Sequence, residues 1–432
     1  MIDRHRERYA GLMIDNGNLF PENLIIEILS RLPVATLLRF KSVCKSWYEI
    51  VESSFFISKH LENYYYNHRN WRERLLILHE EPWSTNFNVC ELLIDDQTFD
   101  VVASSRIKPL FYDAYFCGPC DGLYLFWGHY ENGYRYLWNP SLNEYLRLLK
   151  LISNPNLPSD MASINYPVYG FGFDYNSKDY KVLLIDGCAK KGDKYHKFFR
   201  NDPLSVFIYS LKSNSWRYWG DLKNIYHLVK NNAYTFVNGC YHWIGSHEKI
   251  RHFNYTIIIS FDISTESYKE IPLPKFKEGE AGYGSQLVVH PDSIDFVAVP
   301  VNETKFSIWS RANGTWIRKV TIDSGCRVNK SFIYWWDDML VFGANNRKFS
   351  LRMCDTSTGE MWDIDESEQG EFLQIYIYKE SLVSIGNSVS YSGRQVHHFD
   401  IEFERFMRFE RDLDIIPRWY IDDYPIHHLP RV

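Results

Sequence analysis

A short pattern recurs along most of this chain and constrains its fold more than any other feature of the sequence. Each copy is a strand-like run that ends in an anchor residue, followed by a polar turn and a second bulky residue. The seven anchors, the first and last in weaker copies, are Ile94, Trp138, Tyr209, Phe261, Trp309, Cys354 and Phe399. Successive anchors are 44, 71, 52, 48, 45 and 45 residues apart. This spacing matches the ~40–50 residues of one four-stranded propeller blade, so the sequence predicts a β-propeller.

The number of copies predicts seven blades, with six or eight as alternatives. The interval of 71 residues contains a basic insertion, Lys190–Lys197, which we interpret as a solvated loop in preference to a hidden extra blade. A pair of β-sandwiches would also use many short strands, but the near-constant spacing favours the propeller.

Residues 19–61 differ from the rest because their apolar residues follow a helical period. Pro21 and Pro33 each predict the start of a helix, since proline is tolerated in the first turn. The second helix is expected over Val34–Phe40, and a third is expected to carry Val43, Trp47 and Cys44, with Cys44 in the core. Of these 43 residues 23 are apolar, more than three short helices can bury. Either the chain's own strands or a second protein must cover the excess.

Five fragments in this segment resemble a plant F-box, in order and without a gap. They are Leu19-Phe20-Pro21-Glu22, Ile28-Leu29-Ser30-Arg31-Leu32-Pro33-Val34, Leu37-Leu38-Arg39-Phe40-Lys41, Val43-Cys44-Lys45-Ser46-Trp47 and Phe56-Ile57-Ser58-Lys59-His60-Leu61. Phe20 departs from the leucine that usually precedes the proline in that family, although an aromatic ring still fills an apolar slot.

The strand region is similar to the plant F-box-associated domain. The similarity is carried by Cys120-Asp121-Gly122-Leu123, Leu137-Trp138-Asn139-Pro140-Ser141, Gly170-Phe171-Gly172-Phe173-Asp174-Tyr175, Lys178-Asp179-Tyr180-Lys181-Val182 and Tyr241-His242-Trp243, with Ser260–Thr265 and Glu270–Pro274. The segment Ile377–Ile385 is similar to S-locus F-box proteins in particular.

These resemblances imply a mainly β protein with a small N-terminal α unit that serves as the substrate-receptor subunit of a Skp–cullin–F-box ubiquitin ligase. The F-box would bind a Skp-type adaptor, and through it the cullin and RING subunits, while the propeller holds a protein target. The implied adaptor-binding residues are Pro21, Leu24, Ile28, Leu32, Pro33, Leu37 and Leu38. Val43 and Trp47 are expected to join the helices to one another. Within the S-locus branch the target would be a pistil S-ribonuclease in pollen self-incompatibility; another plant protein, such as a defence or stress regulator, and a non-ligase scaffold are the alternatives.

The expected organisation is a flexible segment 1–18, the F-box 19–61, a connector 62–74, the propeller 75–402 and a tail 403–432. Loops between blades are expected to carry target specificity, and the candidates are 154–169, 187–203 and 275–285.

Composition bounds the class of protein and its partners. With 45% hydrophobic and 24% charged residues, the chain is expected to fold. The sequence has no apolar run near the ~18 residues of a membrane span and no signal peptide, which predicts a cytoplasmic protein, with the nucleus as an alternative. The net charge of −6 disfavours nucleic-acid binding.

Neither the cysteines nor any catalytic motif predicts chemistry, cofactors or metals. Cys117-Gly118-Pro119-Cys120 has the spelling of a redox motif, but a turn and a strand follow it instead of the helix that would activate a thiolate. We therefore expect a buried turn there. His242 and Asp262 are expected to be structural, and the sequence predicts a non-catalytic receptor.

Overall fold

The computed structural model describes residues 21–66 and, with gaps in the loops between strands, residues 74–385. All of the described residues belong to the first of two units, which divide the chain after Ser388. The second unit lies outside the described residues, as do the segment 1–18, the anchor Phe399 and the tail 403–432.

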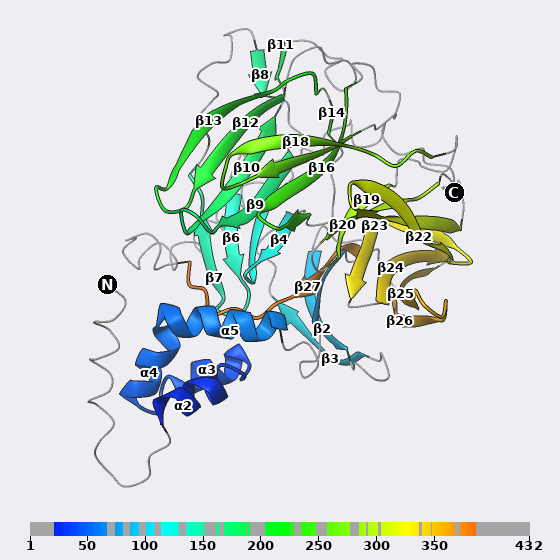
Figure 1. Ribbon diagram of the computed structural model, residues 1–432. Coiled ribbons are helices and arrows are strands. Elements are labelled where there is room, and N and C mark those ends of the chain that lie inside the picture. The colour runs from blue at the N-terminus through cyan, green and yellow to red at the C-terminus, as the bar shows by residue number, and fades with distance from the viewer. Residues whose placement is uncertain are drawn as a thin grey trace, which may run out of the picture. The chain divides into compact units, whose positions relative to one another are not determined.

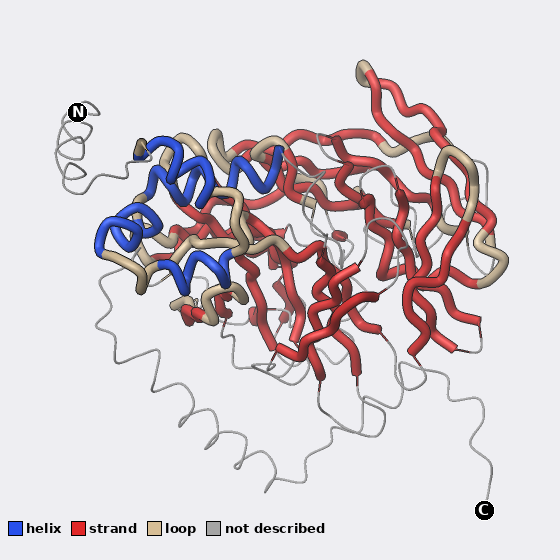
Figure 2. The backbone as a smooth tube through the Cα atoms, turned by 90° about the horizontal axis from the view of Figure 1, so that it is seen from below, coloured by secondary structure: helices blue, strands red, loops and turns tan. Residues whose placement is uncertain are grey.

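Four helices form an N-terminal helical unit, coloured blue in Figures 1 and 2. They are α2 (Glu22–Leu29), α3 (Val34–Phe40), α4 (Lys45–Glu52) and α5 (Ser54–Tyr66). Pro21 and Pro33 directly precede α2 and α3, as the sequence predicts. The expected third helix is divided at Ser53, which has an extended backbone and whose Oγ accepts the N–H of Phe56 at 3.2 Å. A serine in this position caps a new helix, and α5 then continues into the expected connector.

Six antiparallel sheets, five of four strands and one of five, follow the helices and form the blades (Figure 1). The first blade contains β27 (Phe372–Tyr378), β1 (Arg74–Glu80), β2 (Phe87–Ile94) and β3 (Val101–Ile107). The second contains β4 (Ala114–Cys120), β5 (Leu123–Gly128), β6 (Arg135–Asn139) and β7 (Glu144–Arg147). The third contains β9 (Val168–Asp174), β10 (Asp179–Asp186), β12 (Leu204–Ser210) and β13 (Ser215–Leu222).

The remaining blades continue in chain order. The fourth contains β14 (His227–Leu228), β15 (Phe236–Val237), β16 (Cys240–Ser246), β17 (Ile257–Asp262) and β18 (Ser267–Pro272). The fifth contains β19 (Gln286–His290), β20 (Ser293–Ala298), β21 (Lys305–Ala312) and β22 (Thr315–Asp323). The sixth contains β23 (Arg327–Trp336), β24 (Met339–Asn346), β25 (Lys348–Asp355) and β26 (Met361–Ser367).

The six blades meet in a closed ring, which confirms the propeller. Strands of neighbouring blades contact one another in the order β4, β9, β16, β19, β23 and β27, and β27 returns to contact β4. β27 comes from the C-terminal end of the described chain and pairs antiparallel with β1, for example Leu76 with Tyr376. The first blade is thus completed by the last strand, which leaves no open edge in the ring.

The described residues form six blades, which was one of the alternatives to the favoured seven. The six anchors from Ile94 to Cys354 each fall on the third strand of one blade, so the repeat was located correctly. The first blade takes its inner strand from β27, and the weak last copy at Phe399 lies outside the described residues. The long interval between Trp138 and Tyr209 adds only the two-stranded ladder of β8 (Met161–Ser163) and β11 (Cys188–Lys190) among the described residues.

In the second, third and fourth blades the second bulky residue of the repeat lies opposite its anchor on the neighbouring strand. Trp138 pairs with Tyr145, and their rings are parallel within 2° at 6.0 Å between centroids. Tyr209 pairs with Trp216 and Phe261 with Tyr268. Such cross-strand aromatic pairs stabilise a sheet beyond the burial of the rings alone.

None of the helices in the described part of the chain combines the length and the apolarity that a membrane crossing requires.

Candidate docking surface

The helical unit exposes an unusual share of large apolar side chains. On α2, Leu24 and Ile28 are 49% and 56% exposed, and they lie one turn apart on the same face. Four more exposed side chains lie in the rest of the unit: Leu38, Val43, Tyr48 and Phe55. The much larger described part of the propeller adds three, Leu149, Tyr175 and Ile317. A concentration of exposed apolar groups on so small a unit marks an interaction surface.

The opposite face of the helical unit is a buried core that the propeller completes. Its members from the helices are Leu29, Val34, Leu37, Ile50, Val51 and Phe56. Leu382, which follows β27, is 4% exposed and belongs to the same cluster, and Leu142 of the second blade packs against it. The two explanations for the excess apolar surface therefore apply to different faces: one face is covered by the chain's own propeller, and another remains exposed.

The structure divides the residues predicted to bind an adaptor into three groups. Pro21, Leu24, Ile28 and Leu38 are exposed, and Leu32 and Pro33 are half-buried. Leu37 is completely buried, so its expected direct contact with a partner is withdrawn. The reason is helical geometry: Val34 and Leu37 are three residues apart on the inward face of α3, while Leu38 is rotated by about 100° toward solvent.

Two expectations for the segment between α3 and α4 were wrong. Val43 is 60% exposed and Cys44 is also exposed, although both were expected to pack inside. Both residues lie in the short connection between α3 and α4. The expectation assumed that they were part of a helix with its apolar residues facing inward, and the connection is not helical. Trp47 does join the helices as expected, because its ring packs against Phe40 with 5.1 Å between centroids.

Polar contacts fix the helices to one another. The Glu27 carboxylate lies 2.6 Å from both Lys59 Nζ on α5 and the Arg31 guanidinium in the turn after α2. Hydrogen bonds from Lys59 and then Arg31 hold the pKa of Glu27 below its usual value. His60, which is 1% exposed, lies with its Nε2 3.0 Å from the carbonyl oxygen of Leu32. Burial lowers the pKa of His60 more than this hydrogen bond raises it, so its ring is neutral near pH 7.

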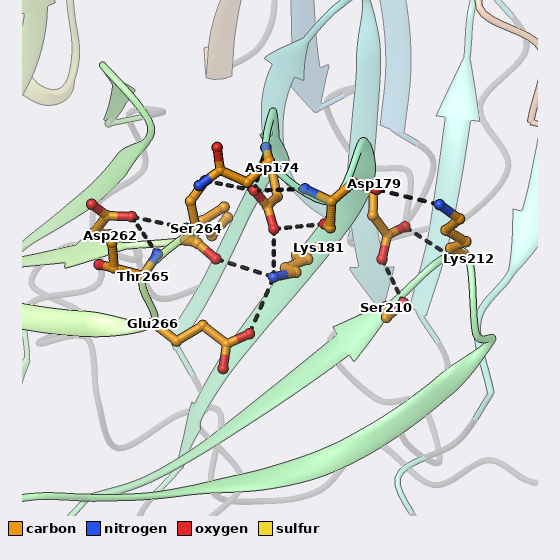
Figure 3. A network of polar contacts seen from close by, with 12 residues as sticks. Asp174, Asp179, Lys181, Ser210, Lys212, Asp262, Ser264, Thr265 and Glu266 are labelled. Atoms are coloured by element: carbon orange, nitrogen blue, oxygen red, sulfur yellow. Dashed lines mark hydrogen bonds and ion pairs between the residues drawn. The ribbon is translucent and has the colours of Figure 1, made fainter. Parts of the chain in front are cut away.

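The third and fourth blades are joined by a buried ionic network (Figure 3). The ammonium group of Lys181 lies 2.7 Å from Asp174 Oδ2 and 3.1 Å from Glu266 Oε1, and it donates to the carbonyl oxygen of Ile263 at 3.2 Å. Ser264 Oγ donates to Asp174 Oδ1 at 2.5 Å. Each charge in this network has a protein partner, so we assign it to holding adjacent blades together.

Other polar residues noted in the sequence are also structural. His242 lies with Nδ1 3.1 Å from the Thr235 carbonyl oxygen and Nε2 3.1 Å from Ser260 Oγ, all within the fourth blade. Asp262 Oδ1 accepts the backbone N–H groups of Ser264 and Thr265 and so shapes the turn after β17.

The Cys117–Cys120 motif occupies the end of β4 and its turn, and both thiols are buried. Burial raises the pKa of the Cys117 thiol to about 12, and the hydrogen-bonding contact with Tyr241 Oη at 3.2 Å offsets only part of this. A buried thiol with a raised pKa is a poor nucleophile at neutral pH, which argues against the redox interpretation of the motif.

Two sequence families match the chain. One, described as the F-box domain, matches residues 18–59, and the other, the F-box associated beta propeller domain, matches residues 73–392. The second match spans well over half of the chain. The chain belongs to the F-box proteins with an associated β-propeller.

Relatives of this F-box protein occur in Arabidopsis thaliana. F-box protein At5g49610 is 28% identical over 305 residues, which cover 68% of this chain and 75% of that protein. F-box protein At3g08750 is 30% identical over 261 residues, which cover 58% of this chain and 59% of that protein. The chain therefore spans about three quarters of the first relative and about six tenths of the second.

The strands that flank the candidate specificity loops end on the side of the blades opposite the turn that packs on the F-box. Leu142, which packs on the F-box core, is in the turn between β6 and β7. The loops 154–169, 187–203 and 275–285 join β7 to β9, β10 to β12 and β18 to β19. Because neighbouring strands are antiparallel, these connections leave the blades at the other end from that turn. Most of the loop residues lie outside the described parts of the chain.

Proposed function

We propose that this F-box protein is the substrate-receptor subunit of a Skp–cullin–F-box ubiquitin ligase. The observation that carries the proposal is the exposure of Leu24 and Ile28 on a unit whose other face is buried against its own propeller. Exposed side chains of this size are unfavourable in water, and a partner that covers them recovers about 25 cal/mol for each Å² of buried apolar area. A Skp-type adaptor is the partner that an F-box implies.

The adaptor-binding surface in this proposal consists of Pro21, Leu24, Ile28 and Leu38, with the accessible edges of Leu32 and Pro33. Leu37 supports this surface from below, because its side chain fills the core under α3.

The receptor performs no chemistry of its own in this proposal. By binding the adaptor at one end and a protein target at the other, it raises the effective concentration of a target lysine near the conjugating enzyme that the cullin and RING subunits deliver. We place the target at the end of the blades opposite the F-box, where the longest connections between strands occur.

A pistil S-ribonuclease is the target that the segment Ile377–Ile385 suggested. The contacts of that segment, described below, are with the F-box and the second blade, so its sequence does not argue for a particular target. A different plant protein, including a defence or stress regulator, therefore remains an equal candidate. A scaffold that uses its F-box outside a ligase is the alternative to the ligase itself.

Binding of the full chain to a purified Skp-type adaptor tests the ligase proposal. We expect a stable complex that also captures the cullin and RING subunits and transfers ubiquitin in a reconstituted reaction. If the wild-type chain does not bind the adaptor, the ligase proposal is wrong.

The target proposal needs a separate measurement. The full chain, held on a support through its adaptor, is exposed to pollen and pistil extracts. Enrichment of a ribonuclease over other plant proteins would support the S-locus target, and its absence would count against that target without affecting the ligase proposal.

A further inference from the structure

Residues 378–385, here called the strap, leave β27 and pass between the F-box and the second blade, as the orange segment of Figure 1 shows. On the propeller side the strap is fixed by several hydrogen bonds. Asn139 Nδ2 donates to the carbonyl oxygens of Ser381 at 3.1 Å and Val383 at 2.8 Å. The backbone N–H of Ile385 donates to Glu144 Oε2 at 2.8 Å. The strap is therefore held against the turn between β6 and β7.

The turn between β4 and β5 touches the strap directly. Gly122 has φ +76°, and a Cβ atom added there would lie 2.4 Å from the Cβ of Ser381 and 2.7 Å from the carbonyl oxygen of Lys379. Only glycine fits this approach. The strap is thus seated on two consecutive turns of the same blade.

On its other side the strap makes a buried polar contact with the F-box. Glu380 is 5% exposed, and its Oε2 accepts the backbone N–H of Val34 at 2.7 Å. Val34 is the first residue of α3, and Pro33 before it provides no side-chain cap. The carboxylate therefore satisfies a backbone donor that the helix leaves unpaired.

An apolar contact adjoins this hydrogen bond. Leu382 enters the cluster that contains Leu29 and Leu37. Glu380 and Leu382 are two residues apart, so one extended segment supplies a polar and an apolar contact to the same F-box. Domains within one chain move relative to each other unless an interface holds them, and these two contacts oppose such motion.

We propose that Glu380 is a positioning residue: through its bond to Val34 it holds the F-box in one orientation on the propeller, and the strap thereby sets the direction in which a bound target faces the rest of the ligase. The functional part of this inference rests on the proposed ligase role. Its structural part, a fixed orientation, stands independently of any partner. The segment that resembles S-locus proteins is accordingly a link between domains.

The test measures the orientation directly in the full chain. Fluorophores are introduced through unnatural amino acids at the exposed positions Ser58 on α5 and Lys223 after β13, which leaves the native cysteines unmodified. Single-molecule energy transfer then gives the distribution of distances between F-box and propeller, and hydrogen exchange reports on α3 and on the strap. The variants are Glu380→Ala, Glu380→Gln and Leu382→Ala, with Glu360→Ala, an exposed glutamate after β25, as the matched control.

We expect a single narrow distance distribution for the wild type and for Glu360→Ala. Glu380→Ala is expected to broaden it and to speed amide exchange in α3 at least tenfold, while exchange in the third blade stays unchanged. Glu380→Gln is expected to restore the narrow distribution, because its Oε1 can still accept the Val34 N–H. If Glu380→Ala does not fold, the distance distribution of Leu382→Ala is compared with that of the wild type, and it is expected to be broader.

Two outcomes would overturn the inference. One is a wild-type distribution that is already broad; the other is a narrow distribution in folded Glu380→Ala, or in Leu382→Ala if Glu380→Ala does not fold. Adaptor affinity is measured separately on the same proteins and is expected to stay within about threefold of wild type. A wild-type chain that does not bind the adaptor would refute the ligase role and leave the distance result standing.

Discussion

The ammonium group of Lys181 on β10 lies 3.1 Å from the carboxylate of Glu266 in the turn between β17 and β18, and so joins the third blade to the fourth. Within its own blade the same ammonium group contacts Asp174 at 2.7 Å. The proposed role in holding a target requires adjacent blades in fixed positions, and this network provides one such attachment.

Replacing Lys181 with methionine is expected to destabilise the propeller, because it leaves the buried carboxylate of Asp174 without its ammonium partner. Breaking a buried ion pair by removing one partner typically costs about 3–5 kcal/mol, and the partial exposure of Glu266 places this case toward the lower end. Urea unfolding measures the loss. Lys212→Met is the control: Lys212 is exposed in the same blade, and a change within about 0.5 kcal/mol is expected there. Equal losses in both variants would contradict the role given to Lys181.

The same network predicts how stability responds to acid. Burial alone would raise the pKa of Asp174, but hydrogen bonds from Lys181, Ser177 and Ser264 outweigh it and hold this pKa well below its usual range. A carboxyl with a lowered folded-state pKa contributes stability above its unfolded value of about 3.9, and that stability is lost as the pH falls through the folded value. We expect the urea midpoint to fall less between pH 5 and pH 2.5 in Lys181→Met than in the wild type. A parallel fall in both proteins would count against this assignment.

Ile28 and Ile317 provide a matched test of the docking surface, because both are 56% exposed. Ile28→Asp is expected to weaken adaptor binding at least a hundredfold, since it places a charge in an apolar interface. Ile317→Asp, on the fifth blade, is expected to bind like the wild type. Both should melt within a few degrees of the wild type, because neither side chain is in the core. Leu32→Asp is also expected to abolish adaptor binding. Its result is harder to interpret, because Leu32 packs partly against the helical core and the change would also affect folding. Unchanged binding by Ile28→Asp would show that the adaptor uses another surface.

The cysteines are expected to differ in reactivity toward iodoacetamide. Cys44 is exposed, whereas Cys117 is buried with a thiol pKa raised to about 12. Thiolates are the reactive species, so Cys44 should be modified within minutes at pH 8 while Cys117 reacts only after unfolding. Mass spectrometry of digested peptides gives both rates. Modification of Cys117 in the folded protein at a rate similar to Cys44 would disagree with the burial described here.

His60 makes the F-box sensitive to mild acid. Burial lowers its pKa, so the unfolded chain takes up a proton at this site before the folded chain does. The neutral His60 ring therefore contributes fully to the free energy of unfolding above about pH 6.5, the pKa of histidine in an unfolded chain. This contribution is lost as the pH falls below that value. Hydrogen exchange in α5 should accelerate between pH 7.5 and pH 5.5, after correction for intrinsic rates. His60→Gln, which keeps an N–H donor for Leu32, should abolish this pH dependence; an unaltered dependence in the variant would assign it to another group.

Much of the propeller follows from local sequence. The anchors Trp138, Tyr209 and Phe261 mark third strands because each ends an apolar run and is followed by a tight turn and an aromatic partner. All of these features lie within about ten residues of one another. Pro21 and Pro33 likewise reveal the starts of two helices, since their effect on the backbone is local.

The errors arise where distant parts of the chain meet. Closing the first blade with β27 depends on a pairing between the two ends of the propeller, so counting copies could not give the blade number. Leu37 and Leu38 are both leucine, and only the position of Leu382 and the neighbouring helices decides which of them is buried. Glu380 gave no signal at all in the sequence, because its partner Val34 is 346 residues away.

That separation has a consequence for the chain while it is being synthesised. At ~5–20 residues per second, a ribosome reaches Glu380 about 17–70 seconds after it has added Val34. During that interval neither the strap that contacts the F-box nor the last strand of the ring, β27, has been synthesised. The newly made helices therefore have both of their apolar faces uncovered, and another protein can bind them before the propeller is complete.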